Sequence, residues 1–223
     1  MRAMILAAGR GERMRPLTDT CPKPLLPVAG KPLLMWHLEK LARMGVSEVV
    51  INTAWLGDAL VDAVGDGANW GLHVHWSHEP PGGLETAGGI VQALPLLGDQ
   101  PFMVVNGDIW TDFDFSVLPR SLEGALGHVV LVNNPLHNPQ GDFALSAEGR
   151  VKLEGQKLTF SGVSVLSPAL FKGVSAGRKG LRPLLQQAIA QGRLTGRHYC
   201  GAWTDVGTPE RLETLEKALA GAG

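Results

Sequence analysis

The sequence is poor in cysteine and nearly balanced in charge. Only two cysteines, Cys21 and Cys200, occur among its 223 residues, and they form no CxxC pair. We therefore expect two reduced thiols in a cytoplasmic protein, and not a secreted protein held by disulfides. The formal net charge at pH 7 is −1. This balance gives no support for a nucleic-acid partner or an anionic membrane surface.

Long apolar runs are also missing. No segment approaches the roughly 20 apolar residues that a membrane-spanning helix needs. Met1 leads directly into a core-like segment, so we expect no signal peptide. Hydrophobic residues make up 44% of the chain and charged residues 18%, which is typical of a globular protein. The length suits one domain over residues 1–223 with a core of its own.

Strand and helix patterns alternate along the first half of the chain. Strands are predicted at 4–8, 49–51, 73–78 and 102–105, and amphipathic helices at 32–45, 56–64 and 86–94. Such alternation predicts an α/β fold of Rossmann-like type, with a mixed, mostly parallel sheet and helices on both faces. Ligands in such folds bind at the carboxyl ends of the strands.

The second half is less regular and its predicted strands have short connections. Strands are predicted at 128–133, 141–146, 160–166 and 198–202, and helices at 181–190 and from 208 onward. Thr208 is placed as the N-cap of the last helix, with Pro209 in its first turn. The apolar stripe of that helix predicts a docking face.

A glycine-rich segment follows the first predicted strand. Gly9 and Gly11 stand as Gly-x-Gly, Arg13 follows, and Lys23 lies between two prolines. Glycine lets backbone N–H groups approach an anion closely. The forked guanidinium group of arginine suits phosphate oxygens, and proline restricts the backbone beside the lysine. The pattern indicates a site for a polyphosphate, although two glycines alone are also explained by a simple turn.

The segment is neither of two common phosphate-binding motifs. A dinucleotide fingerprint requires glycine where Met14 stands, and the pattern G-x-x-x-x-G-K-[ST] is absent. The whole segment instead resembles the signature of the sugar nucleotidyltransferases, L-A-(A/G)-G-x-G-x-R-(M/L)-x-P-L-T followed by P-K-x-L-x-P. That family joins a nucleoside triphosphate to a sugar 1-phosphate and releases pyrophosphate. The resemblance implies nucleotide contacts from Ala8, Gly9, Gly11, Glu12, Arg13 and Lys23.

Two aspartates lie in further family-like motifs, Asp108 in V-V-N-G-D and Asp205 in W-T-D-V-G-T. The resemblance implies that both hold Mg²⁺ and that Arg13 and Lys23 act with them in catalysis. Mg²⁺ prefers oxygen ligands, commonly one or two carboxylates together with phosphates and water. Each aspartate taken alone is equally well explained as a turn residue.

The base and sugar pockets are inferred from resemblance in the same way. The segment 79–89 is similar to the family segment that holds the base, which implies contacts from Gly83 and Gly88. Gly155 stands where the family has a lysine for the sugar phosphate, with Lys179 and Arg182 as possible replacements. The implied division is a nucleotide half at about 1–110 and a sugar half at about 111–223. The implied sugar-binding residues are Asn106, Gly141, Glu154, Ser161 and Gly162.

Within the family, the chain is most similar to short members that transfer a uridylyl group from UTP to N-acetylmuramic acid 1-phosphate in peptidoglycan recycling. The residues that carry this similarity are 6–15, 54–57, 105–108, 159–162 and 203–208. We therefore expect a Mg²⁺-dependent uridylyltransferase acting on two small-molecule substrates. Guanylyl transfer to mannose 1-phosphate, or nucleotidyl transfer to another sugar 1-phosphate, is one alternative. A non-catalytic regulatory subunit that binds nucleotide sugars is another, and the oligomeric state is left open.

Overall fold

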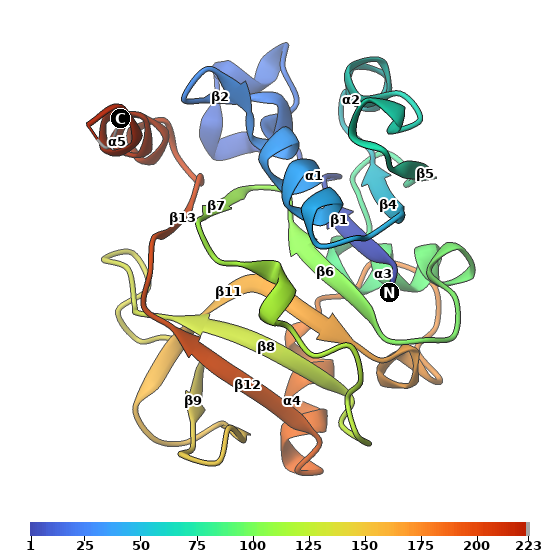
Figure 1. Cartoon of the computed structure of the whole chain (residues 1–223), viewed down its shortest axis with the longest axis vertical. Helices are drawn as coiled ribbons and strands as arrows, with labels where there is room; N and C mark the ends of the chain where they lie inside the picture. Colours follow the sequence, from blue (N-terminus) through green and yellow to red (C-terminus); the bar gives the residue numbers. More distant parts are fainter. Residues whose placement is uncertain (222–223) are drawn as a thin grey trace.

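A nine-stranded mixed sheet runs through the computed structural model, which describes residues 1–221 (Figure 1). Its central path is β10-β9-β11-β6-β1-β4-β5, with β8 beside β11 and β12 beside β8. The strands are β1 (Ala3–Leu6), β4 (Glu48–Thr53), β5 (His73–His78), β6 (Phe102–Asn106), β8 (Gly127–Val132), β9 (Phe143–Leu145), β10 (Val151–Lys152), β11 (Lys157–Leu166) and β12 (Leu194–Tyr199).

The parallel part of the sheet is β6-β1-β4-β5, and it forms the centre of the first half. Ala3, Met4 and Ile5 of β1 are completely buried, as expected for a strand covered on both faces. In the rest of the sheet, β11 pairs antiparallel with β6, β8 and β9, and β12 pairs parallel with β8. The predicted α/β fold with a mixed sheet is confirmed, and its parallel strands are mainly those of the first half.

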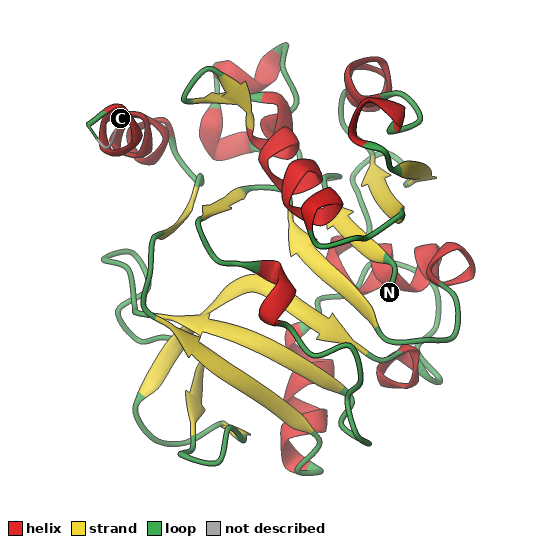
Figure 2. Ribbon diagram, viewed as in Figure 1, coloured by secondary structure: helices red, strands yellow, loops and turns green. Residues whose placement is uncertain are grey.

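Helices cover both faces of this sheet, as predicted (Figure 2). Leucines of α1 and α2 share one hydrophobic cluster with one face of β1, β4 and β6. Apolar residues of α3 and α4 pack in a second cluster against the other face. The helices are α1 (Leu33–Arg43), α2 (Gly57–Val64), α3 (Glu85–Leu97), α4 (Arg182–Ala190) and α5 (Pro209–Ala220). No helix within residues 1–221 is both long and apolar enough to cross a bilayer.

Short elements complete the chain, and one pair of them lies next to the site described below. β7 (Ile109–Thr111) pairs antiparallel with β13 (Trp203–Asp205), and β2 (Pro27–Val28) pairs with β3 (Lys31–Pro32). The 3₁₀ turns are η1 (Glu12–Met14), η2 (Leu17–Asp19), η3 (Lys23–Leu25), η4 (Ala68–Trp70), η5 (Phe115–Val117) and η6 (Pro168–Phe171).

The strand predicted at 198–202 lies earlier in the structure, at Leu194–Tyr199. Leu194 pairs with Gly127 and the pairing with β8 continues to Tyr199. After Tyr199 the chain leaves the sheet, and the carbonyl of Ala202 accepts a hydrogen bond of 2.8 Å from the Thr111 hydroxyl. Cross-strand pairing with β8 therefore sets this boundary, which local composition could not reveal.

The last helix, α5, docks as its apolar stripe predicts. Leu215 packs in a third hydrophobic cluster with Met14, Val28 and Trp110. The Thr208 hydroxyl accepts a long hydrogen bond of 3.4 Å from the backbone N–H of Arg211, which makes Thr208 the N-cap. The helix thus ties the segment after β13 to the glycine-rich segment of the first half.

Candidate active site

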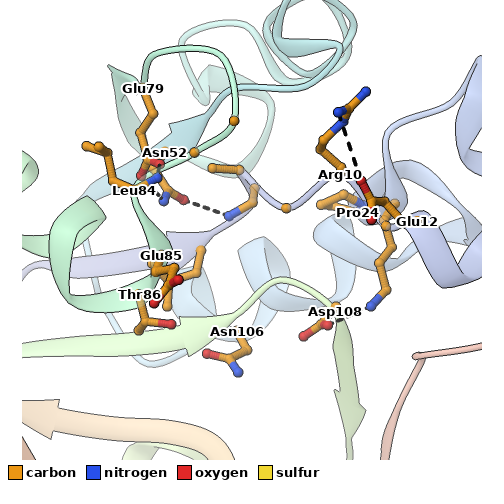
Figure 3. A pocket seen from close by; sticks show the side chains of 18 of the residues that line it. Arg10, Glu12, Pro24, Asn52, Glu79, Leu84, Glu85, Thr86, Asn106 and Asp108 are labelled. Atoms are coloured by element: carbon orange, nitrogen blue, oxygen red, sulfur yellow. Dashed lines mark hydrogen bonds and ion pairs between the residues drawn. The ribbon is translucent and has the colours of Figure 1, made fainter. Parts of the chain in front are cut away.

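A cavity of about 770 Å³ lies at the carboxyl ends of β1 and β6, where an α/β sheet is expected to bind ligands. Figure 3 shows side chains on its wall, with Asn52 and Glu79 on one side and Asp108 on the other. The residues that line it are 6–13, Lys23, Pro24, Asn52, Glu79, 82–86, Asn106, Asp108, Arg178 and Gly207.

The glycine-rich loop forms one wall of the cavity. Gly11 has a φ of 64°, and a Cβ added there would lie 2.9 Å from Cγ2 of Thr18. The Thr18 hydroxyl donates to the Gly11 carbonyl at 2.8 Å, which fixes the turn. At Gly9 an added Cβ would meet no atom within 4 Å. The loop therefore presents open backbone to the cavity, as an anion site requires.

The basic residues of this segment divide into two groups. Arg10 and Arg13 line the cavity. The Arg10 guanidinium lies 4.6 Å from the centre of the Trp55 ring and 3.9 Å from the Glu12 carboxylate. Arg15 is not part of the lining described for residues 1–221, and its Nε lies 3.2 Å from the Asp19 carboxylate.

Lys23 and Asp108 meet at the edge of the cavity. The Lys23 side chain is 9% exposed, and its Nζ donates to Oδ2 of Asp108 at 2.6 Å. A side chain would not fit at Gly107, since an added Cβ would lie 2.6 Å from the Leu6 carbonyl oxygen. The turn after β6 therefore passes closely against β1 and directs Asp108 toward the glycine-rich loop.

Asp205 is a backbone neighbour of Asp108, although its side chain has other partners. Val206 N–H donates to the Asp108 carbonyl at 2.8 Å, and Asp205 pairs with Ile109 across β13 and β7. The Asp205 carboxylate contacts Arg211, and its Oδ1 lies 2.9 Å from Nε2 of His137. Of the two predicted metal ligands, Asp108 lines the cavity, and Asp205 is not among the lining residues found in the described chain.

The two aspartates offer only oxygen donors to a divalent cation. Within residues 1–221 there is no group of three or more histidine, cysteine, aspartate or glutamate side chains that could hold a metal. Asp108 still offers a free oxygen, since Oδ1 has no hydrogen-bond partner in this described part of the chain. One or two carboxylates completed by phosphate and water oxygens fit Mg²⁺, and this donor set does not suggest a metal that needs nitrogen or sulfur ligands.

Buried polar residues form the opposite wall. The Ala7 N–H donates to Oδ1 of Asn52 at 2.7 Å, and the Asn52 amide donates to Oε1 of Glu79 at 2.6 Å. The second oxygen of Glu79 accepts the Leu84 N–H at 2.7 Å. Sequence reasoning did not single out Asn52 or Glu79. The available signal was weak: Asn52 is a polar residue near the end of the apolar strand β4, and Glu79 directly follows β5.

The predicted base contacts fall in two different places. Gly83 lines the cavity. Gly88 lies in α3, outside the lining, and a Cβ added there would lie 2.2 Å from the Gly177 carbonyl oxygen. The N–H groups of Ala87 and Gly88 both donate to the Lys179 carbonyl, at 2.9 and 3.1 Å. Gly88 therefore allows the 177–180 segment to pack on the start of α3.

This packing brings Arg178 to the cavity, a residue that sequence reasoning missed. Its Nε donates to the Glu85 carboxylate at 2.8 Å, and its side chain is 68% exposed. Arg182, expected as a possible cation for the sugar phosphate, instead contacts Asp142. Lys179 contributes the backbone contacts to α3. Two glycines, Gly177 and Gly180, flank the basic pair and were the local signal for an exposed loop.

The predicted sugar-binding residues are brought together only in part. Asn106 lines the cavity, and Gly162 packs on it, since an added Cβ would lie 2.7 Å from Nδ2 of Asn106. The neighbouring Ser161 is buried, and its carbonyl accepts the Trp203 indole N–H at 2.9 Å. Gly141 has a φ of 63° and packs against Asn134 and Lys157. Glu154 is exposed in the turn between β10 and β11.

Comparisons with known proteins agree with this fold. An N-acetylmuramate alpha-1-phosphate uridylyltransferase of Neisseria meningitidis serogroup B is 55% identical, covering 100% of this chain and 99% of the relative. A protein of the same name from Caulobacter vibrioides is 34% identical, covering 99% and 97%. A Bacillus anthracis structure, named as a glucose-1-phosphate thymidylyltransferase in complex with sucrose, has a TM-score of 0.83 at 22% identity, covering 99% of this chain and 95% of that one.

The structural match, at this low identity, establishes the fold alone. Family membership is established by sequence. A family model described as nucleotidyl transferase matches residues 2–141, which include the glycine-rich loop, Lys23, Asn106 and Asp108. Together with a relative that is 55% identical along the whole chain, this match confirms the resemblance seen in the motifs, and the chain belongs to the nucleotidyl transferase family.

Proposed function

We propose that this nucleotidyltransferase moves a uridylyl group from UTP to N-acetylmuramic acid 1-phosphate, giving UDP-N-acetylmuramic acid and pyrophosphate. The observation that carries the reaction class is the Lys23–Asp108 pair facing a glycine-rich loop across one cavity. The choice of base and sugar is supported by the 55% identity to the Neisseria relative over the full chain. This reaction would belong to the recycling of cell-wall peptidoglycan.

The glycine-rich loop binds the triphosphate in this proposal. The backbone of the loop, open at Gly9 and turned at Gly11, supplies N–H groups to phosphate oxygens, and Arg13 supplies a forked cation. Lys23 contacts the phosphate at which displacement occurs. Its buried position fixes the ammonium group before substrate arrives, so little conformational entropy is lost on binding.

The acceptor phosphate attacks the α-phosphorus in line with the leaving pyrophosphate. No general base is required, because a phosphate monoester with a second pKa of about 6 is already mostly dianionic at neutral pH. Catalysis then consists of positioning and charge neutralisation. Lys23 and Arg13 neutralise the nucleotide phosphates, and Arg178, at the cavity edge, is positioned to neutralise the acceptor phosphate.

The site also suits Mg²⁺ held by Asp108 and Asp205, together with phosphate oxygens and water. When bound, such an ion neutralises the negative charge of two phosphorylated substrates that must approach one another. The backbone contact between Val206 and Asp108 keeps the two aspartates adjacent. To hold such an ion, Asp205 would have to give up its present contact with Arg211.

The buried wall of Asn52 and Glu79 lies on the side of the cavity away from Asp108 (Figure 3). We place the base against this wall and Gly83. The wall has little freedom to adapt, since both oxygens of Glu79 are hydrogen-bonded and Asn52 is 3% exposed. Such a wall favours one base through fixed donors and acceptors.

The direct test is pyrophosphate release with Mg²⁺, crossing UTP, GTP, CTP and dTTP with the 1-phosphates of N-acetylmuramic acid, N-acetylglucosamine, glucose and mannose. Release mainly from UTP with N-acetylmuramic acid 1-phosphate is expected. Preference for GTP with mannose 1-phosphate would replace the proposed substrates and leave the site intact. No release from folded protein would favour a non-catalytic nucleotide-sugar-binding subunit.

A further inference from the structure

A cluster of Arg211, Asp205 and His137 lies beside the cavity and is not explained by nucleotide binding. Arg211 is in the first turn of α5, where the helix dipole disfavours a cation. Its guanidinium contacts the Asp205 carboxylate and lies 2.9 Å from Nε2 of His137. The Arg211 side chain is only 19% exposed. A mostly buried cation in an unfavourable helix position is expected to have a role other than stabilising the helix.

The guanidinium lies directly against the cavity lining. A Cβ added at Gly207 would lie 2.4 Å from Nη2 of Arg211, and Gly207 lines the cavity. Only Nη1 of Arg211 donates side-chain hydrogen bonds among the residues described at 1–221. A guanidinium carries five N–H donors in a planar fork. Arg211 and His137 are not among the lining residues found within 1–221, and Gly207 lies between the guanidinium and the cavity. The Nη2 and Nε groups donate no hydrogen bond within these residues, so they remain available to a further acceptor that reaches past Gly207.

His137 connects this cluster to the sugar half. It belongs to the segment 133–142 between β8 and β9, which also contains Gly141. The segment is fixed by the Asn134 amide, which donates to the Lys157 carbonyl at 2.9 Å, and by Asn138, which donates to Thr159 at 3.1 Å. The cluster thus joins α5, the end of β13 and a sugar-half loop at one point.

N-acetylmuramic acid differs from N-acetylglucosamine by a lactyl ether that carries a carboxylate. We propose that Arg211, supported by His137, binds this carboxylate and so selects the acidic amino sugar; the inference rests on the proposed function. A part-buried guanidinium binds a carboxylate more strongly than an exposed one. The side chains of Arg178 and Arg182, in contrast, are 68% and 56% exposed and pair with Glu85 and Asp142.

Arg211 is now paired with Asp205, and we infer that the ligand carboxylate can take the place of the Asp205 carboxylate. Asp205 now neutralises the guanidinium, yet in the proposed function Asp205 would hold Mg²⁺ together with substrate phosphate oxygens. A part-buried cation left without its counter-ion is costly. The ligand carboxylate replaces the protein carboxylate, so binding of an acidic sugar releases Asp205 for its role in the reaction. A neutral sugar offers no such replacement.

The test is isothermal titration of UDP-N-acetylmuramic acid and UDP-N-acetylglucosamine, with Mg²⁺, into the wild type, Arg211→Gln, Arg211→Lys and the control Lys217→Gln on the same helix. The wild type and the control should prefer the acidic product. In Arg211→Gln, affinity for UDP-N-acetylmuramic acid should fall by about 10- to 100-fold, as for loss of a charged hydrogen bond. Affinity for UDP-N-acetylglucosamine should change by less than about 3-fold, so the preference disappears. Arg211→Lys should keep part of it.

Equal loss of affinity for both products in Arg211→Gln would overturn the proposal, because it would assign Arg211 only to the positioning of Asp205. A wild type without preference for the acidic product would also overturn it. If Arg211→Gln does not fold, His137→Gln gives the same test through the loop. Pyrophosphate release by the wild type is measured separately, so that a failure of the proposed reaction is distinguished from a failure of carboxylate selection.

Discussion

Lys23 combines burial with a single charged partner, a 2.6 Å contact with Asp108. Lys23→Met should lower kcat by about 100- to 1,000-fold, because an aligned charge at the reacting phosphate is lost. The free energy of unfolding should change by less than about 1 kcal/mol, since Asp108 is 40% exposed and regains hydration. Steady-state kinetics and urea unfolding measure the two effects. Lys152→Met, at an exposed position of β10, is the control, and near-normal kcat in Lys23→Met would contradict the role.

Asp108 carries the second prediction at this scale. Asp108→Asn keeps the shape of the side chain and removes its charge, so turnover should fall by at least about 100-fold while the protein stays folded. Pyrophosphate release and circular dichroism measure these outcomes. Asp62→Asn, an exposed change in α2, is the matched control. Turnover of Asp108→Asn close to the wild-type value would refute the assignment of Asp108 to charge neutralisation.

His37 makes stability depend on pH. Burial, and to a lesser extent the nearby charge of Lys40, lowers the pKa of His37 from 6.5 to about 4. The unfolded chain therefore binds a proton that the folded chain excludes, and the free energy of unfolding falls as pH decreases from about 6.5 to about 4. The loss should reach about 3 kcal/mol at pH 4. Urea unfolding of wild type and His37→Leu measures it, and an equal pH dependence of the two would contradict the origin in His37.

Residues in contiguous motifs could be predicted, and residues that depend on tertiary contacts could not. Gly9, Gly11 and Lys23 lie in one segment whose local chemistry already indicates phosphate binding. Arg178, in contrast, reaches the cavity only because Lys179 and Gly88 pack two distant segments together. The partners of Arg211 are 6 and 74 positions away in sequence, so no local pattern reveals them.

Among the elements, α3 and the segment 177–180 depend on one close approach. Gly88→Ala would place a Cβ 2.2 Å from the Gly177 carbonyl oxygen, so this backbone must move and carry Arg178 with it. KM for the sugar phosphate should rise by about 10-fold, as for one lost charged contact. Gly180→Ala, whose Cβ would lie 3.4 Å from Glu85, should have little effect on KM. A normal KM in Gly88→Ala would show that Arg178 does not contact the acceptor.

The docking of α5 gives a stability prediction. Leu215 is 7% exposed and packs in the third cluster, so Leu215→Ala should lower the free energy of unfolding by about 2 kcal/mol or more. Leu136 is fully exposed, and Leu136→Ala should change it by less than about 0.5 kcal/mol. Urea unfolding followed by tryptophan fluorescence measures both. Equal effects of the two changes would mean that α5 is not held by this packing.

Strands and helices with long, regular patterns were predictable as elements, whereas short ones were not. β7 and β13 have three residues each and exist because they pair with one another. Such pairing depends on chain segments about 90 residues apart, and no periodicity of three residues can indicate it. This unpredicted pair sets the relative position of Asp108 and Asp205.

For the whole molecule, we propose that the nucleotide and sugar halves form one cooperative unit. β6 of the first half pairs with β11 of the second, joining Val105 to Val163, and β7 pairs with β13. Fluorescence and circular dichroism should therefore report one coincident urea transition. A fragment of residues 1–110 should not fold, because β6 would expose an unpaired apolar edge. Two separate transitions would contradict a single unit.

The pairing of β13 with β7 also has a consequence for how the protein is made. Synthesis delivers the chain from its N-terminus, so the nucleotide loop, Lys23 and Asp108 leave the ribosome long before Asp205 and α5. β7 can therefore pair with β13 only after residues 203–205 have emerged. A nascent chain that ends before β13 therefore has the glycine-rich loop, Lys23 and Asp108 without Asp205, and if the proposed roles hold we expect it to be inactive.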